Sequence, residues 1–149
     1  MPSKPSMKVS DIMSKDLVSC HENDSAQQAA RMMCDNDIGS LPVVDSDNRL
    51  LGVVTDRDIC CRIIARGMPS DTSIREAMTR DMHTVHPDAD LRELESTMKK
   101  FKVRRVPVVD DEGKLQGYVA QADLLLHLKE APRQEHEVVV VLEEISVPW

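Results

Sequence analysis

The chain has 149 residues, of which 41% are hydrophobic, a normal share for a globular protein. Its formal net charge of −7 argues against non-specific binding to nucleic acid, because such binding needs a basic surface. No apolar run approaches the roughly 20 residues of a membrane-spanning helix, and the first residues lack the apolar stretch of a signal peptide. We therefore expect a cytoplasmic protein without a membrane anchor.

The sequence repeats itself, because residues 9–60 correspond without a gap to residues 74–125. Pro42-Val43-Val44-Asp45 in the first copy, for example, matches Pro107-Val108-Val109-Asp110 in the second. Self-similarity at a fixed spacing indicates two copies of one folding unit. We predict a first repeat over residues 9–67, a linker over 68–73, a second repeat over 74–131 and a C-terminal tail over 132–149.

The predicted elements follow the same order in both repeats. A short helical lead-in (9–14 and 74–79) is followed by a short strand (17–20 and 82–85) and then by a helix. Ser25 in the first repeat and Asp90 in the second are the expected N-caps of that helix. A hairpin (41–54 and 106–119) leads to a second helix, which ends at Gly67 in the first repeat. The pattern predicts an α+β fold of two β-α-β-β-α units packed about a pseudo-twofold axis.

Apolar residues at helical spacing predict which helix faces are buried. The first helix of each repeat carries such a stripe, namely Ala26, Ala29, Ala30 and Met33 in one repeat and Leu91, Leu94, Met98 and Phe101 in the other. The second helix of repeat 1 carries Ile59, Cys60, Ile63 and Ile64 on one face. In the tail, residues 138–142 are too apolar for a solvated segment, so we expect an added strand on a sheet edge or a partner chain, with disorder as the alternative.

The sequence contains no recognisable catalytic set. It lacks a G-x-S-x-G elbow, an H-E-x-x-H zinc motif and a phosphate-binding Walker loop, so we expect neither an enzyme nor a metalloprotein. The four cysteines have no C-x-x-C spacing and no metal-ligand pattern with histidine. We interpret Cys20, Cys34, Cys60 and Cys61 as small buried side chains, and a redox or metal-sensing role as the least favoured alternative.

The turn into the second helix is the most informative segment. It is Thr55-Asp56-Arg57-Asp58 in repeat 1 and Ala120-Gln121-Ala122-Asp123 in repeat 2. Thr55 and Asp58 have the spacing of a capping box, which stabilises a helix by about 1 kcal/mol. Ala120 has no side-chain acceptor for a cap, yet Asp123 is retained. Two interpretations therefore stay open, a helix cap alone or an aspartate that also binds a ligand.

These motifs together resemble a tandem pair of CBS domains, the unit called a Bateman module, over roughly residues 9–128. The residues that carry the resemblance are Ile38-Gly39-Ser40-Leu41-Pro42-Val43-Val44-Asp45, Leu51-Gly52-Val53-Val54-Thr55-Asp56-Arg57-Asp58-Ile59, their counterparts in repeat 2, and Thr84-Val85-His86-Pro87-Asp88. The resemblance implies regulation rather than catalysis. Similar CBS pairs bind adenine nucleotides or related adenosyl compounds in the cleft between the two repeats.

The resemblance also implies a set of ligand-binding residues. In the family, the hydroxyl of the T/S-x-x-D turn contacts phosphate and the aspartate accepts the ribose hydroxyls, a task that suits a carboxylate because it is purely an acceptor. Residues just before the Pro-Val-Val strand of one repeat approach the phosphates of the ligand held by the other. Carried over, the set is Thr55, Asp58, Val103, Arg104 and Arg105 for one site, and Asp123, Ile38 and Ser40 for the other.

We therefore predict a regulatory module that senses AMP, ADP or ATP, with no catalytic cofactor. A phosphorylated nucleotide is expected to bind first at Asp58, because Arg104 and Arg105 supply the cations that a phosphate needs in a chain of this net charge. The protein effector is expected to be a separate molecule. The alternative function is a dimerisation scaffold without a ligand, which Ala120 favours because it lacks the family's hydroxyl.

A homodimer is also expected. The family resembled here forms dimers through exposed helix faces, and Ile59, Ile63 and Ile64 supply more apolar surface than one repeat needs. The apolar tail segment is expected to add a strand across that contact.

Overall fold

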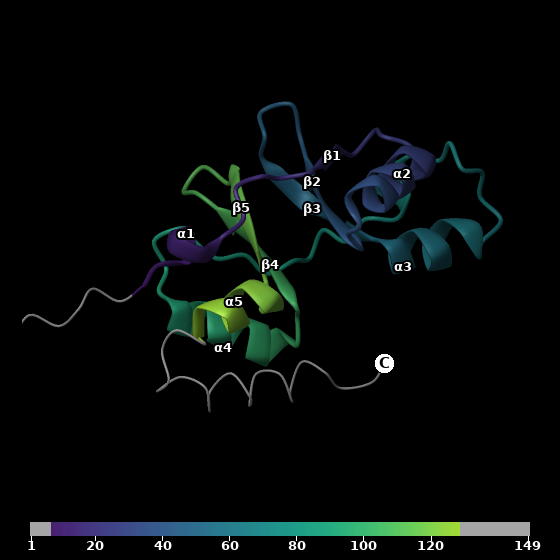
Figure 1. The fold of residues 1–149 in the computed structure, drawn as a ribbon. Helices are drawn as coiled ribbons and strands as arrows, with labels where there is room; N and C mark the ends of the chain where they lie inside the picture. The colour runs from purple at the N-terminus through teal and green to yellow at the C-terminus, as the bar shows by residue number, and fades with distance from the viewer. Residues whose placement is uncertain (1–6, 129–149) are drawn as a thin grey trace, which may run out of the picture. The chain divides into compact units, whose positions relative to one another are not determined.

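The computed structural model describes residues 7–128, which form two compact units (Figure 1). The repeat 1 unit consists of Leu17–Met82 and Glu112–Leu115. The repeat 2 unit consists of the described parts of Met1–Asp16, His83–Asp111 and Gln116–Trp149. Both units mix helices with small sheets, which confirms the predicted α+β class.

The repeat 1 unit has the predicted β-α-β-β-α order. Its elements are β1 (Cys20–His21), α2 (Ala26–Asn36), β2 (Ser40–Val44), β3 (Leu50–Thr55) and α3 (Asp56–Ile59), which continues as a π-helix, η1 (Cys60–Ile64). Strand β2 lies between β1, to which it is parallel, and β3, to which it is antiparallel. Helix α2 begins with the predicted capping box, in which Ser25 Oγ accepts from Gln28 N at 3.1 Å and Gln28 Oε1 accepts from Ser25 N at 2.8 Å.

The repeat 2 unit follows the same order with a weaker first strand. Its elements are α1 (Val9–Ile12), α4 (Leu91–Phe101), β4 (Arg105–Val109), β5 (Leu115–Ala120) and α5 (Gln121–Leu128). The strand predicted over residues 82–85 is reduced to one parallel bridge between Val85 and Val108. The reason is that Pro87 occupies the position of Glu22 in the first repeat, and proline has no N–H with which to continue the ladder.

Each sequence repeat contributes its first segment to the core of the other unit. Val9, from the lead-in of repeat 1, is fully buried in the core that contains Leu94 and Val119 of repeat 2. Its equivalent Ile74, in the 3₁₀-helix η2 (Ile74–Glu76), is fully buried in the repeat 1 core. The compact units therefore differ from the sequence repeats by an exchange of lead-ins and by Glu112–Leu115, which belongs to the repeat 1 unit.

The exchanged lead-ins pair with the hairpins through equivalent backbone hydrogen bonds. Ser14 and Tyr118 exchange two such bonds, at 2.9 and 3.1 Å, and Thr79 and Val53 do the same at 2.8 and 3.0 Å. These pairs occupy corresponding positions in the two repeats. The exchange is consequently a property of the repeated sequence and is present in both units.

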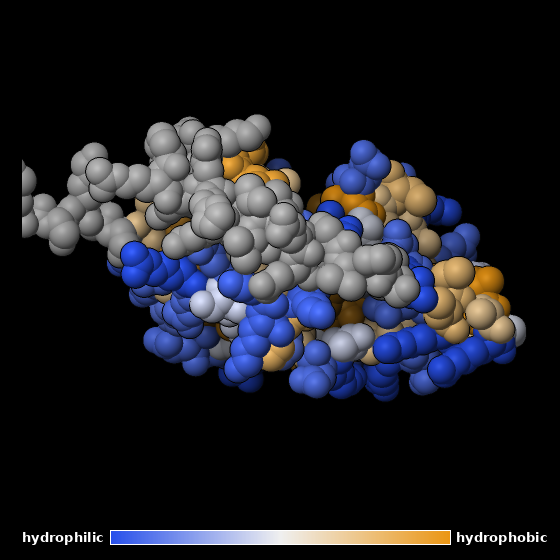
Figure 2. All heavy atoms as spheres, turned by 90° about the horizontal axis from the view of Figure 1, so that it is seen from below, coloured by the Kyte–Doolittle hydropathy of each residue, from blue (hydrophilic) through white to orange (hydrophobic). Residues whose placement is uncertain are grey.

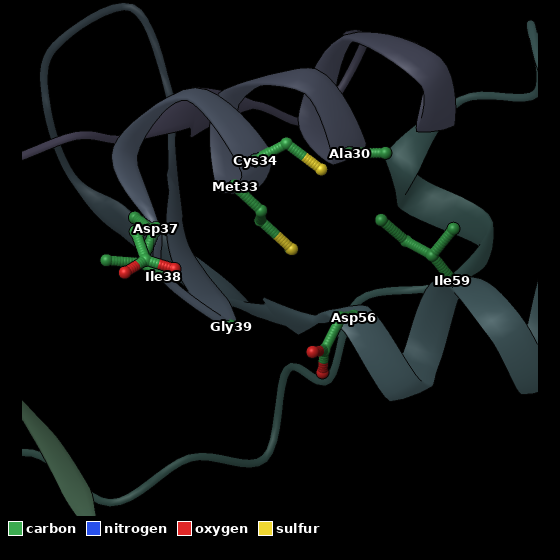
Figure 3. A pocket seen from close by; sticks show the side chains of 8 residues that line it. All are labelled: Ala30, Met33, Cys34, Asp37, Ile38, Gly39, Asp56 and Ile59. Atoms are coloured by element: carbon green, nitrogen blue, oxygen red, sulfur yellow. The ribbon is translucent and has the colours of Figure 1, made fainter.

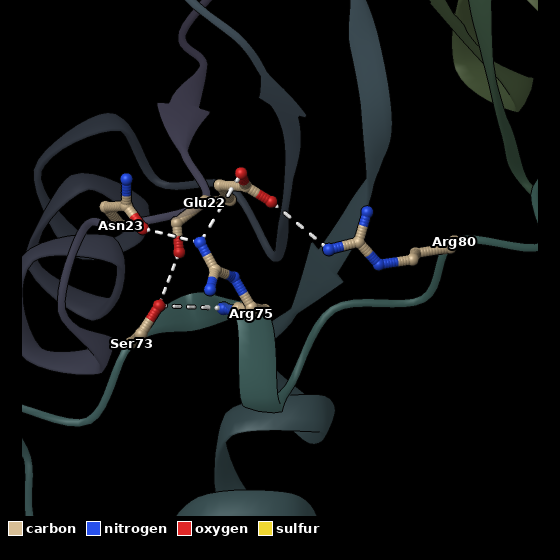
Figure 4. A network of polar contacts seen from close by, with 5 residues as sticks. All are labelled: Glu22, Asn23, Ser73, Arg75 and Arg80. Atoms are coloured by element: carbon tan, nitrogen blue, oxygen red, sulfur yellow. Dashed lines mark hydrogen bonds and ion pairs between the residues drawn. The ribbon is translucent and has the colours of Figure 1, made fainter.

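A polar network fixes the second lead-in to the repeat 1 unit (Figure 4). Glu22 forms ion pairs with Arg75 at 3.5 Å and with Arg80 at 3.1 Å, and its backbone carbonyl accepts from Ser73 Oγ at 2.5 Å. Arg75 Nη2 also donates to Asn23 Oδ1 at 2.8 Å. Because both arginines are about half exposed, we expect these ion pairs to orient the segment more than to stabilise it.

The predicted apolar faces are correct for the first helices except at one residue. Ala26, Ala29 and Met33 are buried, as are Leu91, Leu94 and Met98, with Ala30 half-buried. Phe101 is the exception, because it lies at the last position of α4 and is 39% exposed, with its ring stacked on His83.

The apolar face predicted for the second helix of repeat 1 is wrong at Cys60 and Ile64. Ile59 and Ile63 are buried in their own unit, whereas Ile64 is 59% exposed. The π-helix explains the difference: Ala65 N donates to Cys60 O, five residues earlier, so the widened turn rotates residues off the α-helical face. Ile59 and Ile63 are therefore not available to a dimer contact. Figure 2 shows mostly hydrophilic side chains, with smaller hydrophobic groups between them, on the face it displays.

The tail strand predicted over residues 138–142 lies outside the described residues. Within residues 7–128, no helix combines the length and the apolar character that crossing a membrane requires.

Candidate functional site

The turn between β3 and α3 forms the predicted capping box of repeat 1. Thr55 Oγ1 accepts a hydrogen bond from Asp58 N at 3.0 Å, and Asp58 Oδ2 accepts one from Thr55 N at 2.9 Å. Both side chains are half-buried. Asp58 Oδ1 has no hydrogen-bond partner among residues 7–128, so this oxygen is available to accept from a ligand.

Two other predicted site residues lie beside this turn. Ser40, at the start of β2, pairs with Thr55 in the β2–β3 register and is only 9% exposed. Ile38 precedes it and is half-buried. Between them, Gly39 O accepts from Asp56 N at 3.0 Å, which fixes the start of β2 against the start of α3. The structure therefore groups Ile38, Ser40, Thr55 and Asp58 within one unit.

The equivalent turn of repeat 2 retains half of the box. Asp123 Oδ2 accepts from Ala120 N at 2.9 Å, the same bond that Asp58 makes to Thr55 N. A helix-capping role is thus sufficient to explain why the aspartate is retained beside Ala120. As at Asp58, the second oxygen of Asp123 has no hydrogen-bond partner among residues 7–128.

The arginines of repeat 2 lie beside the Asp123 turn. Gln121 N donates to Arg104 O at 2.7 Å, the counterpart of the bond between Asp56 and Gly39. Arg104 is exposed, and Arg105 is half-buried at the start of β4. Val103, also half-buried, packs against the repeat 2 core. That these residues serve a ligand held by Asp58 stays a prediction.

A pocket of about 360 Å³ lies between α2 and α3 in the repeat 1 unit (Figure 3). Met33 from α2 and Ile59 from α3 point into it, and the carboxylates of Asp37 and Asp56 lie at the end nearest Gly39. Ala30, Cys34 and Ile38 complete the lining. Of the predicted site residues, only Ile38 is part of this pocket. Sequence reasoning missed Asp56, although it stands within the turn, because no motif assigns it a role.

The cysteine prediction is correct for Cys20 and wrong for the other three. Cys20 is fully buried in β1, and burial, together with the nearby charge of Asp24, raises the pKa of its thiol to about 12. Cys34, Cys60 and Cys61 are exposed. Across residues 7–128, His, Cys, Asp and Glu side chains do not gather in any group of three or more suited to a metal ion.

The sequence profile of the CBS domain matches residues 9–64 and 74–130, which together cover most of the chain. The chain belongs to the CBS domain family. Solved structures that resemble it are also CBS pairs, so the resemblance to a tandem module is confirmed.

Two curated relatives match this chain over most of their own length. Hypoxic response protein 1 of Mycobacterium tuberculosis is 35% identical over 139 residues, covering 93% of each chain. The uncharacterized protein YlbB of Bacillus subtilis is 40% identical over 120 residues, covering 80% of each.

Two similar crystal structures contain a bound metal or bound small molecules. That of hypoxic response protein I, with two coordinated zinc ions, is 34% identical with a TM-score of 0.75 and covers 82% of this chain and 99% of that one. That of the CBS domain pair of protein MJ0100, in complex with 5′-methylthioadenosine and S-adenosyl-L-methionine, is 32% identical with a TM-score of 0.74 and covers 85% and 98%.

Proposed function

We propose that this CBS protein is a regulatory module that binds an adenosyl ligand, either AMP, ADP or ATP or a related adenosyl compound. The observation that carries the proposal is the Thr55–Asp58 turn, where one carboxylate oxygen of the half-buried Asp58 has no hydrogen-bond partner in the described part of the chain. A ribose needs such an acceptor, because its two hydroxyls are donors. The adenosyl ligands bound by the CBS pair of MJ0100 support the same ligand class.

The proposed roles follow the chemistry of the side chains. Asp58 accepts the ribose hydroxyls, and Thr55 donates its hydroxyl to phosphate. Arg104 and Arg105 supply charge-assisted hydrogen bonds to phosphate, with Val103 beside them. In the second site, Asp123 accepts the ribose hydroxyls, and the neighbouring Ile38 and Ser40 are uncharged. The ligand acts as an effector and not as a catalytic cofactor, and the response passes to a separate protein partner.

A second arrangement has a specific observation in its favour. Arg104 is hydrogen-bonded to the turn that carries Asp123, so the cations and this aspartate belong to one unit. A phosphorylated nucleotide that bound there would use Asp123 for its ribose. The two arrangements predict opposite effects of substituting Asp58 and Asp123.

Calorimetry with AMP, ATP and S-adenosyl-L-methionine tests the proposal. We expect Asp58→Asn and Arg105→Ala each to weaken the tighter site about tenfold or more, and Asp123→Asn to leave it nearly unchanged. Asparagine keeps an oxygen that can cap α3 but replaces the second acceptor by a donor, so the loss of binding is separated from the loss of the cap. Asp58→Ala, which loses both the capping oxygen and the second acceptor, is the matched comparison.

The outcomes distinguish the alternatives. If Asp123→Asn abolishes the tighter site and Asp58→Asn does not, the arrangement within the repeat 2 unit is correct. If none of the adenosyl compounds binds the wild-type protein, the ligand-free dimerisation scaffold is favoured.

A further inference from the structure

One buried amide in the repeat 2 unit has no hydrogen-bond partner. Gln121, the first residue of α5, is half-buried, and its Nε2 is buried without a partner among residues 7–128. No other buried side-chain nitrogen or oxygen in that part of the chain lacks one. Such a group destabilises the folded state, because it has lost its hydrogen bonds to water. An acceptor supplied by a ligand would remove that cost.

Gln121 occupies the position that Asp56 has in repeat 1, on the same backbone. Asp56 N donates to Gly39 O at 3.0 Å, and Gln121 N donates to Arg104 O at 2.7 Å. A Cβ at Gly39 would lie 3.3 Å from Asp56 Oδ2. Because Arg104 has a Cβ at the equivalent position, we expect the side chains of Arg104 and Gln121 to begin side by side.

The residue that ends α4 adds a further cation. Lys102 lies at φ 53° and ψ 45°, and its counterpart Asp37 lies at φ 53° and ψ 48°. In repeat 1, Asp37 lines one pocket together with Gly39 and Asp56 (Figure 3). The shared backbone places the three counterparts at the equivalent position between the end of α4 and the start of α5, namely Lys102, Arg104 and Gln121.

The chemistry of this position in repeat 2 suits an anion. A lysine, an arginine and an unpartnered amide nitrogen all donate hydrogen bonds, whereas repeat 1 presents two carboxylates and a glycine. Residues 98–109 contain five lysines and arginines and no acidic residue, although the whole chain has a net charge of −7. Glu95, in place of Ala30, is the one acidic counterpart of the pocket lining, and it already has a polar partner.

We propose that the repeat 2 unit binds an oxyanion between the end of α4 and the start of α5, through Gln121, Lys102 and Arg104. Gln121 Nε2 donates to one oxygen, and the two cations supply charge-assisted hydrogen bonds to the others. Phosphate matches this donor set, either as free inorganic phosphate or as the phosphoryl group of a nucleotide. The site uses neither Thr55 nor Asp58, and it shares only Arg104 with the phosphate contacts proposed above.

Repeat 1 supplies substitutions that the backbone already accepts. Gln121→Asp, Lys102→Asp and Arg104→Gly each install the residue that repeat 1 carries at the equivalent position. Gln121→Leu removes the donor without adding a charge. Gln27→Asp is the matched control, because it changes the net charge as Gln121→Asp does, at an exposed position near the start of α2 in the other unit.

NMR spectroscopy of the isotope-labelled full chain measures binding. The side-chain amide resonance of Gln121, identified by its absence in Gln121→Leu, should shift to saturation with inorganic phosphate at an ionic strength held constant with NaCl. The backbone amides of Arg105 and Ala122 report binding in the variants. We expect the dissociation constant for phosphate to rise at least about tenfold in all four site variants and to stay unchanged in Gln27→Asp.

Thermal unfolding without phosphate gives an independent readout of the unpartnered amide. Gln121→Leu should unfold at a higher temperature than the wild-type chain, because it removes a buried donor that has no partner. A Gln121→Leu chain that is less stable than the wild type would show that Nε2 is satisfied within the protein, which overturns the proposal.

AMP and adenosine distinguish the two sources of phosphate. A shift of the Gln121 amide at lower concentrations of AMP than of inorganic phosphate identifies the phosphoryl group of a nucleotide, and the reverse order identifies the free ion. An equal response to adenosine, which has no phosphate, would reject the site.

Two further results would overturn the proposal. One is an unshifted Gln121 amide at saturating phosphate, and the other is a Gln121→Leu chain that binds phosphate like the wild type. Calorimetric binding of AMP without any change at Gln121 would reject this site and leave the adenosyl site at Asp58 standing. Phosphate binding at Gln121 by a chain that binds no adenosyl compound would retain this site and reject the proposed adenosyl function.

Discussion

The two repeats are most instructive where their backbones agree and their side chains differ. Asp58 and Asp123 make the same hydrogen bond to the start of their helices, although Thr55 is replaced by Ala120. Asp37 and Lys102 adopt the same left-handed conformation with opposite charge. At these positions the two repeats share the backbone conformation and its hydrogen bonds but differ in their side chains. Differences between them therefore point to function, and identities point first to folding.

The largest effect is expected where a lead-in crosses a hairpin. A Cβ at Gly52 would lie 2.5 Å from Thr79 O and 2.5 Å from Met78 Cε, whereas the three atoms nearest to a Cβ at Gly117 all belong to the Met13 side chain, with Sδ at 2.5 Å. A methionine side chain can move, but the paired backbone of Thr79 cannot. We expect Gly52→Ala to lower the free energy of unfolding by about 3 kcal/mol and Gly117→Ala by about 1 kcal/mol. Urea denaturation followed by circular dichroism measures both.

The comparison is informative because both substitutions also stiffen the unfolded chain equally. If Gly52→Ala and Gly117→Ala lowered the free energy of unfolding equally, the backbone of the second lead-in would have to be as mobile as the Met13 side chain. The exchange of lead-ins would then be less rigid in the repeat 1 unit than its hydrogen bonds indicate.

An intermediate effect is expected from exchanging the cap residues. Thr55→Ala removes the hydroxyl that accepts from Asp58 N and converts the first turn into the second, so we expect a loss of about 1 kcal/mol. Ala120→Thr converts the second turn into the first and should gain up to about 1 kcal/mol. Thermal unfolding of Thr55→Ala, Ala120→Thr and the double variant measures these changes in stability. A destabilised Ala120→Thr would show that α5 does not start in the geometry of α3.

Much of the fold could be predicted because the repeat fixes it twice. The N-caps at Ser25 and Asp90, the hairpins and the α+β class follow from local spacing, and each is supported by both copies, whereas the reciprocal capping boxes form in repeat 1. The exchange of lead-ins could not be predicted. Val9 and Ile74 are apolar and could be buried in the core of either unit, and periodicity does not indicate which one. The π-helix was also unpredictable, since it depends on how the chain after Ile59 packs.

The candidate site was predictable only in part. The pairing of Thr55 with Asp58 follows from their spacing, and Ser40 joins them through the strand register. The pocket between α2 and α3 was missed, because Asp37 and Asp56 are distant in sequence and each looks like an ordinary surface charge. Comparing the charges of the two repeats position by position is the signal that could have identified it.

The smallest effect is expected at Cys20, whose counterpart in repeat 2 is Val85. Both are buried and both face a parallel partner strand, so Cys20→Val should change the free energy of unfolding by less than about 1 kcal/mol at neutral pH. The difference should appear at alkaline pH. Because the thiol pKa rises from 9.0 to about 12 on folding, the unfolded chain ionises first, and wild-type stability should fall as pH rises from about 9 towards 12. Cys20→Val should lack that part of the decline, whereas Cys61→Val, at an exposed position, should retain it. Unfolding measured at several pH values compares the three proteins, and identical slopes would show that the Cys20 thiol is not shielded as its burial indicates.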